Sequence, residues 1–154
     1  MTAPINMIDF VRSVNTRQRG RACVVLSREY EDQRDWATKL AEQTNSGHLD
    51  LLESFAQDQE LSSKIGQFMV PKLFEFLKNH TQDEVLVISR LEFLLATWSA
   101  QPDAIDEFLS QVKTWDKEPA LIFVIQHNTK MTTYDFGRRF QYTYLVDQRE
   151  TLAL

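Results

Sequence analysis

The sequence has 154 residues, of which 43% are hydrophobic and 25% are charged, a composition typical of a soluble globular protein. This length fits one domain with a sizeable core, so we expect residues 1–154 to form a single domain. The net charge of -5 disfavours nucleic acid and acidic membranes as partners of the surface as a whole. No apolar run approaches the ~18 residues of a membrane span, and the first residues lack the charged-then-apolar pattern of a leader. A single cysteine, Cys23, excludes an intramolecular disulfide. We therefore expect a cytoplasmic protein without a membrane partner.

The first predicted helix covers residues 5–14, where apolar residues recur at every third position. A basic connector follows it. Residues 1–26 carry one acid, Asp9, against four arginines: Arg12, Arg17, Arg19 and Arg21. We interpret these arginines as a solvated face or a docking edge for a partner, with a phosphate-contacting patch as the alternative. Because exposed charges contribute little to stability, reversing Arg17, Arg19 and Arg21 is expected to leave folding nearly unchanged.

Residues 22–43 predict a strand, a loop and a helix in succession. The apolar run 22–26 is the strand, with Cys23 as a buried core residue, and the polar residues 27–34 are the loop. In nucleotide-binding proteins the same unit carries GxxxxGK[ST], whose backbone N–H groups and lysine bind phosphates. In this sequence the glycine, lysine and hydroxyl positions hold Ser27, Asp32, Gln33 and Arg34. The loop also has three acids against two arginines, so no nucleotide cofactor is expected.

The rest of the chain predicts strands that alternate with helices. Residues 48–55 are interpreted as a second strand, although 51–55 could equally begin a helix. Helices are expected at 58–68 and at 71–78, where Pro71 suits the first turn. The later elements are a strand at 84–89, a turn and short helix at 91–98, a helix at 103–115, a strand at 120–126, a loop at 127–139 and a strand at 140–146. Such alternation predicts a parallel sheet with right-handed crossovers.

The second nucleotide motif is also replaced. A magnesium site would need acids directly after the strand 84–89, but Ser89 and Arg90 stand there. Glu92 follows and is interpreted as a helix N-terminal or salt-bridging acid. The polar residues 126–128 are interpreted as loop-capping residues, with ligand sensing as the alternative. Arg138 and Arg139 are interpreted as docking or solvated charges, or as a finger that reaches a neighbour's nucleotide.

The order of these elements resembles that of a small additional-strand P-loop NTPase. More narrowly, the segment SRLEFLL is similar to the D-x-[IL]-E-x-L-L segment of the small P-loop-type protein of bacterial phage-defence islands of the BREX kind. It matches at Leu91, Glu92, Leu94 and Leu95 and departs at Ser89. The resemblance spans roughly residues 21–146. It implies an α/β fold with three αβα layers and a mostly parallel five-stranded sheet, P-loop NTPase-like but without a functional P-loop. The family's nucleotide-binding residues are not carried over.

We therefore expect a pseudo-ATPase, without cofactor or metal, that acts as an adaptor or regulatory subunit of a bacterial multiprotein complex. The resemblance adds anti-phage defence to this expectation. Other protein subunits are the expected partners, and self-association is left open. An alternative is a nucleic-acid-binding, recombinase-like module. Six arginines would then converge on one face to contact DNA: Arg12, Arg17, Arg19, Arg21, Arg138 and Arg139. A third hypothesis is an enzyme that uses Asp50, Glu53 or Glu92 with a borrowed metal.

Overall fold

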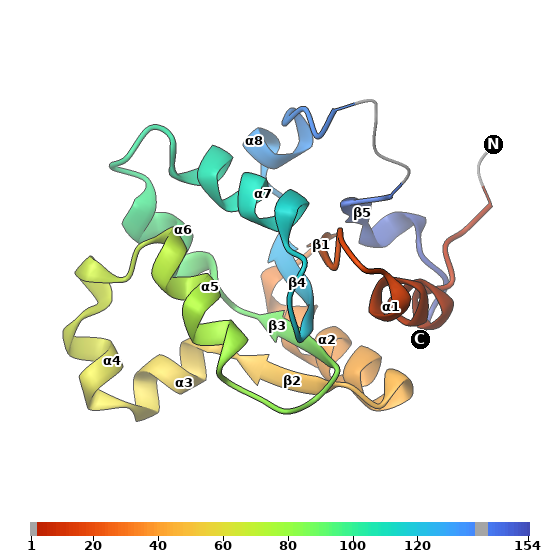
Figure 1. Cartoon of the computed structure of the whole chain (residues 1–154), viewed down its shortest axis with the longest axis horizontal. Helices are drawn as coiled ribbons and strands as arrows, with labels where there is room; N and C mark the ends of the chain where they lie inside the picture. The colour runs from red at the N-terminus through yellow and green to blue at the C-terminus, as the bar shows by residue number, and fades with distance from the viewer. Residues whose placement is uncertain (1–2, 138–141) are drawn as a thin grey trace.

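The computed structural model describes residues 3–137 and 142–154, and it is built on one five-stranded parallel sheet. The strands lie in the order β2-β3-β4-β1-β5, with helices on both faces (Figure 1). Along the chain the elements are α1 (Met7–Thr16), β1 (Ala22–Ser27), α2 (Tyr30–Thr44), β2 (Gly47–Asp50), α3 (Leu51–Gln57), α4 (Gln59–Ser63), η1 (Ile65–Gln67), α5 (Val70–Lys78), β3 (Val85–Ser89), α6 (Glu92–Trp98), α7 (Ala104–Thr114), β4 (Ala120–Gln126), α8 (Thr129–Thr132), β5 (Leu145–Asp147) and η2 (Gln148–Glu150). The predicted three-layer α/β fold is therefore confirmed, and all five strands are parallel.

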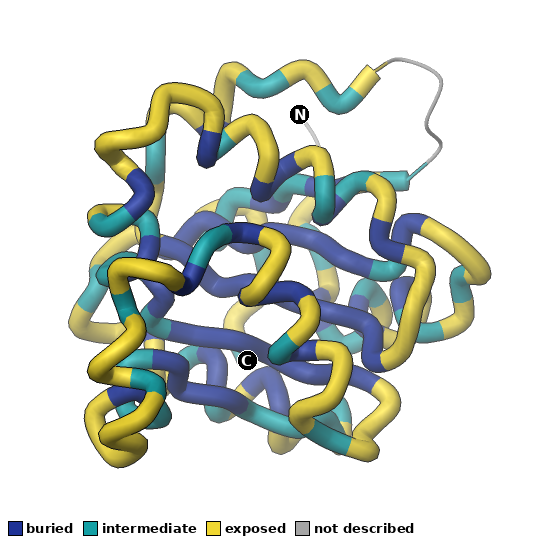
Figure 2. Tube along the Cα trace, turned by 60° about the vertical axis from the view of Figure 1, so that its left-hand side comes forward, coloured by how far each residue is buried: buried dark blue, intermediate teal, exposed yellow. Residues whose placement is uncertain are grey.

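The two faces of the sheet are covered by different helices. Successive side chains of a strand point to opposite faces, so the alternate residues of β1 enter two separate cores. Cys23 and Val25 pack with α1 and α2, whereas Val24 and Leu26 pack with α3, α5, α6 and α7. Figure 2 shows the result as a dark buried sheet between helices with exposed outer sides. Burial on both faces explains why the central strands read as unbroken apolar runs.

Six apolar residues of the central strands are buried, as the apolar runs at 22–26, 84–89 and 120–126 indicate. Each has a relative exposure of 1% or less: Val24, Val25, Leu86, Val87, Ile122 and Val124. Cys23 is also fully buried, and this desolvation raises the pKa of its thiol to about 12. A thiol in this environment is a core residue and not an activated nucleophile.

Two predicted boundaries are wrong near the sheet. The expected strand at 48–55 ends at Asp50, and the helix α3 starts at the next residue because the Asp50 side chain caps it by accepting from the Glu53 N–H. The alternative that 51–55 begins a helix is therefore the correct one. The expected loop at 27–34 is also much shorter, since α2 begins at Tyr30.

The other boundaries differ less. The helix expected at 58–68 is divided into α4 and the 3₁₀ turn η1, and the loop at 127–139 contains the short helix α8. Asn128 caps α8 by accepting from the N–H groups of Lys130 and Met131, as expected for a loop-capping residue. The last strand, predicted at 140–146, is Leu145–Asp147, and residues 140 and 141 lie outside the described residues. None of the helices in residues 3–137 and 142–154 is long and apolar enough to cross a membrane.

Candidate functional site

Polar side chains gather at the carboxyl end of the sheet, which is where open parallel sheets bind ligands. Four polar side chains are buried in the described part of the chain: Ser27, Gln33, Asp50 and Ser89. Ser27, Asp50 and Ser89 are the last residues of β1, β2 and β3, and Gln33 lies in the first turns of α2. Ser27, Gln33 and Ser89, which stand in the two replaced nucleotide motifs, are thus brought to one edge of the sheet, whereas Asp32 is exposed on α2.

Gln33, at the position of the phosphate-binding lysine, is fully buried and bonded within the protein. Its Nε2 donates to Glu92 Oε2 at 2.7 Å and approaches Ser27 Oγ at 3.4 Å. Its Oε1 accepts from the Arg90 backbone N–H. The backbone N–H of Gln126, at the end of β4, donates to the same Glu92 oxygen at 2.7 Å. One side chain of α2 is therefore joined to the ends of β1, β3 and β4.

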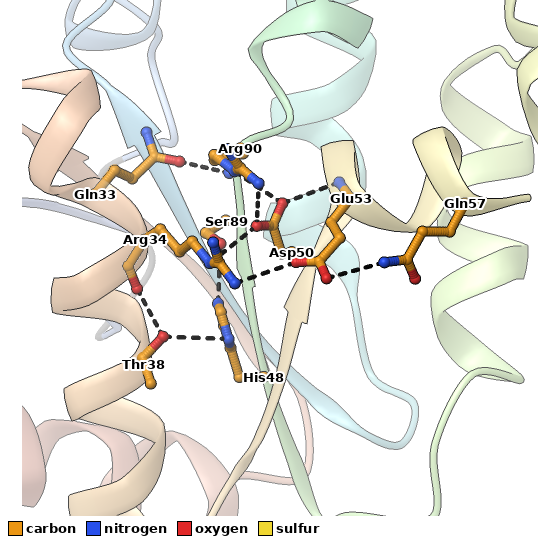
Figure 3. Close-up of polar contacts among 9 residues, drawn as sticks. All are labelled: Gln33, Arg34, Thr38, His48, Asp50, Glu53, Gln57, Ser89 and Arg90. Carbon is orange, nitrogen blue, oxygen red and sulfur yellow. Dashed lines mark hydrogen bonds and ion pairs between the residues drawn. The ribbon is translucent and has the colours of Figure 1, made fainter.

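The second cluster is built around Asp50, whose side chain is 7% exposed. Arg90 binds both of its carboxylate oxygens, with Nε 2.9 Å from Oδ1 and Nη2 on Oδ2, and Arg34 Nε lies 3.2 Å from Oδ2. Arg34 also pairs with Glu53 at 3.2 Å, and Gln57 donates to that glutamate (Figure 3). Arg34 and Arg90 occupy the positions of the missing hydroxyl and acid residues. Both cations neutralise acids of the protein itself.

Arg90 also has a left-handed backbone, with φ 57°. This conformation costs a non-glycine residue on the order of 1–3 kcal/mol. The contacts of Gln33 with its N–H and of Asp50 with its guanidinium hold the residue there. The same two contacts therefore fix the path of the chain between β3 and α6.

His48 links this cluster to the interior. Its Nε2 lies 2.9 Å from the Oγ of the buried Ser89, and its Nδ1 lies 3.4 Å from Thr38 Oγ1 on α2. Burial lowers the pKa of His48, and the cations Arg34 and Arg90 lower it further, against the opposing effect of Asp50 and Glu53. The fully buried Ser89 cannot meet a substrate, so we do not assign a nucleophile to this pair.

This lowered pKa makes stability depend on pH. Below the ordinary value of 6.5 the unfolded chain protonates His48 before the folded protein does. The free energy of unfolding should therefore decrease as pH falls from about 6.5 toward the lower folded pKa. Denaturant unfolding at several pH values should show that His48→Gln flattens this slope. The exposed His80 provides the matched control: an equal flattening in His80→Gln would contradict the assignment.

The arrangement offers little for nucleotide or metal chemistry. Only Arg28 and Glu29 connect β1 to α2, so no long loop curls its N–H groups around a phosphate. Within the described ranges no group of three or more His, Cys, Asp or Glu side chains could hold a metal ion. Of the acids suggested for a borrowed metal, Asp50 and Glu53 share Arg34 as a partner, whereas Glu92 binds Gln33.

The basic residues near the N-terminus have different roles. Arg21 donates to the carbonyl oxygens of Asn15, Arg17 and Lys117 at 2.6, 2.7 and 3.1 Å. Arg17 donates to the Gly20 carbonyl, and its guanidinium lies 4.4 Å from the Tyr142 ring centroid. Burial lowers the pKa of Arg17. The premise that Arg17 and Arg21 are exposed charges is therefore wrong, since both side chains contact the turn between α1 and β1. We now expect their reversal to destabilise the fold.

The other four of the six arginines considered for docking are Arg12, Arg19, Arg138 and Arg139. Arg12 and Arg19 are exposed, and Arg12 makes only a 3.9 Å surface pair with Asp9. Arg138 and Arg139 lie outside the described residues. The convergence of all six arginines on one face therefore stays a prediction.

The fold and the site together define a class: a three-layer α/β protein with an all-parallel sheet whose carboxyl end is filled by its own polar side chains. No protein-family model matches the sequence, and no curated protein shows significant sequence similarity to it.

Sequence reasoning missed that the replaced positions contact one another. The available signal was that the strands end in polar residues at 27, 50 and 89, since parallel strands end at a common edge.

Proposed function

We propose that this protein is a pseudo-ATPase, a non-catalytic adaptor or regulatory subunit of a larger protein complex. The observation that carries the proposal is the buried Gln33. It stands at the position of the phosphate-binding lysine, has no charge, and uses its amide on Glu92 and Arg90. A side chain used in this way is not available to a triphosphate. A bacterial complex with an anti-phage role is the setting that the resemblance implies.

The strand order supports this relation to the P-loop fold. β4 lies between β1 and β3, which is the arrangement that the term additional strand describes. The chain therefore keeps the frame of a nucleotide-binding domain, while the connection from β1 to α2 has shrunk to two residues. A domain that does not bind nucleotide can still bind other proteins through its surface, and this is the basis of the proposed adaptor role.

The surface favours polar docking. Of the large hydrophobic side chains in residues 3–137 and 142–154, Leu152 is the exposed one, at 46%. An obligate apolar interface would need a contiguous exposed patch, so we infer contacts through charged and polar groups. Arg12 and Arg19 are the exposed members of the basic segment that can take part without loss of a structural contact.

These two arginines separate the adaptor from the nucleic-acid alternative. The double variant Arg12→Glu/Arg19→Glu should keep its free energy of unfolding within about 0.5 kcal/mol. Arg21→Gln should lower the free energy of unfolding by about 1–3 kcal/mol, because three carbonyl oxygens lose their donor.

DNA binding is tested separately. We expect no retention of DNA by the unmodified protein at low salt. Retention that disappears at higher salt and in the double variant would favour the nucleic-acid module.

The adaptor role is tested on the tagged protein in its native host. Complexes isolated with ATP and after enzymatic removal of ATP should contain the same partners in the same amounts. A partner that is retained only with ATP, or no stable partner under either condition, would contradict the proposal.

A further inference from the structure

Two hydrogen-bond donors from separate elements converge on one oxygen of Glu92. Gln33 Nε2 comes from α2 and the Gln126 N–H comes from the end of β4, and each lies 2.7 Å from Glu92 Oε2. Distances this short are typical of hydrogen bonds to a charged acceptor. The carboxylate of Glu92 is therefore bound by the protein in the way that a small anion is bound.

Contacts that do not involve Glu92 hold both donors in place. Gln33 Oε1 accepts from the Arg90 N–H, which fixes the amide so that Nε2 faces Glu92. Gln126 is aligned with Ser27 in the β1–β4 pairing, and the His127 N–H donates to the Ser27 carbonyl at 3.0 Å. The two donors should thus keep their positions when the carboxylate is removed.

We propose that Gln33 Nε2 and the Gln126 N–H form an anion site, which the Glu92 carboxylate occupies as an internal ligand. A small monocarboxylate such as formate should bind there when the Glu92 side chain is removed. The site supplies two donors to one oxygen, while Glu92 Oε1 is buried and lacks a hydrogen-bond partner in the described part of the chain. This chemistry suits a monocarboxylate better than a phosphate ion, whose four oxygens would need more donors. The inference rests on the proposed function in one respect. In a protein that does not bind ATP, Gln33, at the position of the missing lysine, can be used to bind Glu92.

The test is chemical rescue of Glu92→Ala by sodium formate, with sodium chloride at equal ionic strength as the reference. The variant should have a lower Tm than the unmodified protein. Formate should raise that Tm with the logarithm of its concentration once it exceeds Kd, by about 2–4 °C for each fivefold increase in the folded-to-unfolded ratio. Glu92→Gln retains an acceptor oxygen, so it should fold and show no formate response. Glu53→Ala, which removes an exposed carboxylate, should not respond either.

Adding Gln33→Ala to Glu92→Ala removes one donor and should abolish the response. If Glu92→Ala does not fold alone, the refolding yield against formate concentration replaces Tm as the readout. The inference is overturned if formate raises neither quantity, or if it acts equally on the unmodified protein. No nucleotide is present in this experiment, so it can fail while the protein remains unable to bind ATP.

Discussion

Val87→Asp should unfold the protein under conditions in which the unmodified chain is fully folded. Val87 is fully buried in β3, where it packs with α1, α2 and the neighbouring strands. The side chains of this cluster are apolar, so a carboxylate at this position would be desolvated. An unpaired buried charge costs several kcal/mol, a large part of the roughly 5–15 kcal/mol that stabilises a typical domain.

Circular dichroism and denaturant unfolding measure this effect. Leu152→Asp is the matched control, because it places the same charge on an exposed apolar residue and should change the free energy of unfolding by at most about 0.5 kcal/mol. A Val87→Asp protein with native circular dichroism and an unchanged unfolding midpoint would contradict the assignment of β3 as a strand covered on both faces.

Asp50→Ala should give the second largest loss. Asp50 accepts from Arg90, pairs with Arg34 and caps α3, so the change removes three interactions at once. It also leaves the Arg90 guanidinium, only 24% exposed, without its carboxylate. Breaking such a pair costs ~3–5 kcal/mol when both charges are fully buried, and the partial exposure of Arg90 places our expectation near 3 kcal/mol.

Glu53→Ala is the comparison for this variant. Its carboxylate is 41% exposed and pairs with the half-exposed Arg34, so its loss should cost about 1 kcal/mol or less. Equal losses of unfolding free energy in the two variants, measured by denaturant unfolding, would contradict the prediction that Asp50 contributes more to stability than Glu53.

The strands and their burial could be predicted because a parallel strand that is covered on both faces leaves an apolar run in the sequence. Val85–Ser89 and Ala120–Gln126 are the clearest cases. The start of α3 could not be placed with the same certainty, since residues 48–55 are apolar enough for a strand or a helix. The Asp50 cap on the Glu53 N–H decides between them, and the Arg90 side chain that also binds Asp50 lies 40 positions away in the sequence.

The polar site was less predictable for the same reason. The sequence showed that Gln33 and Arg90 replace motif residues, but not that Gln33 accepts from the Arg90 N–H and donates to Glu92. These contacts join residues 57 and 59 positions apart. Likewise, Arg17 and Arg21 stand in a polar segment typical of surface charges, whereas in the structure Arg21 donates to the Asn15 carbonyl and Arg17 lies over the Tyr142 ring.

Titration calorimetry with ATP and Mg²⁺ on the isolated protein tests the central claim most directly. Each lost charge-assisted phosphate contact costs about 1.5–3 kcal/mol, and the lysine, the hydroxyl residue and the glycine backbone are all replaced. Gln33→Lys alone should not restore binding, because its ammonium would lie beside Glu92. We predict no measurable heat of binding for either protein at millimolar ATP and no phosphate release above background. A micromolar Kd for the unmodified protein would contradict this account.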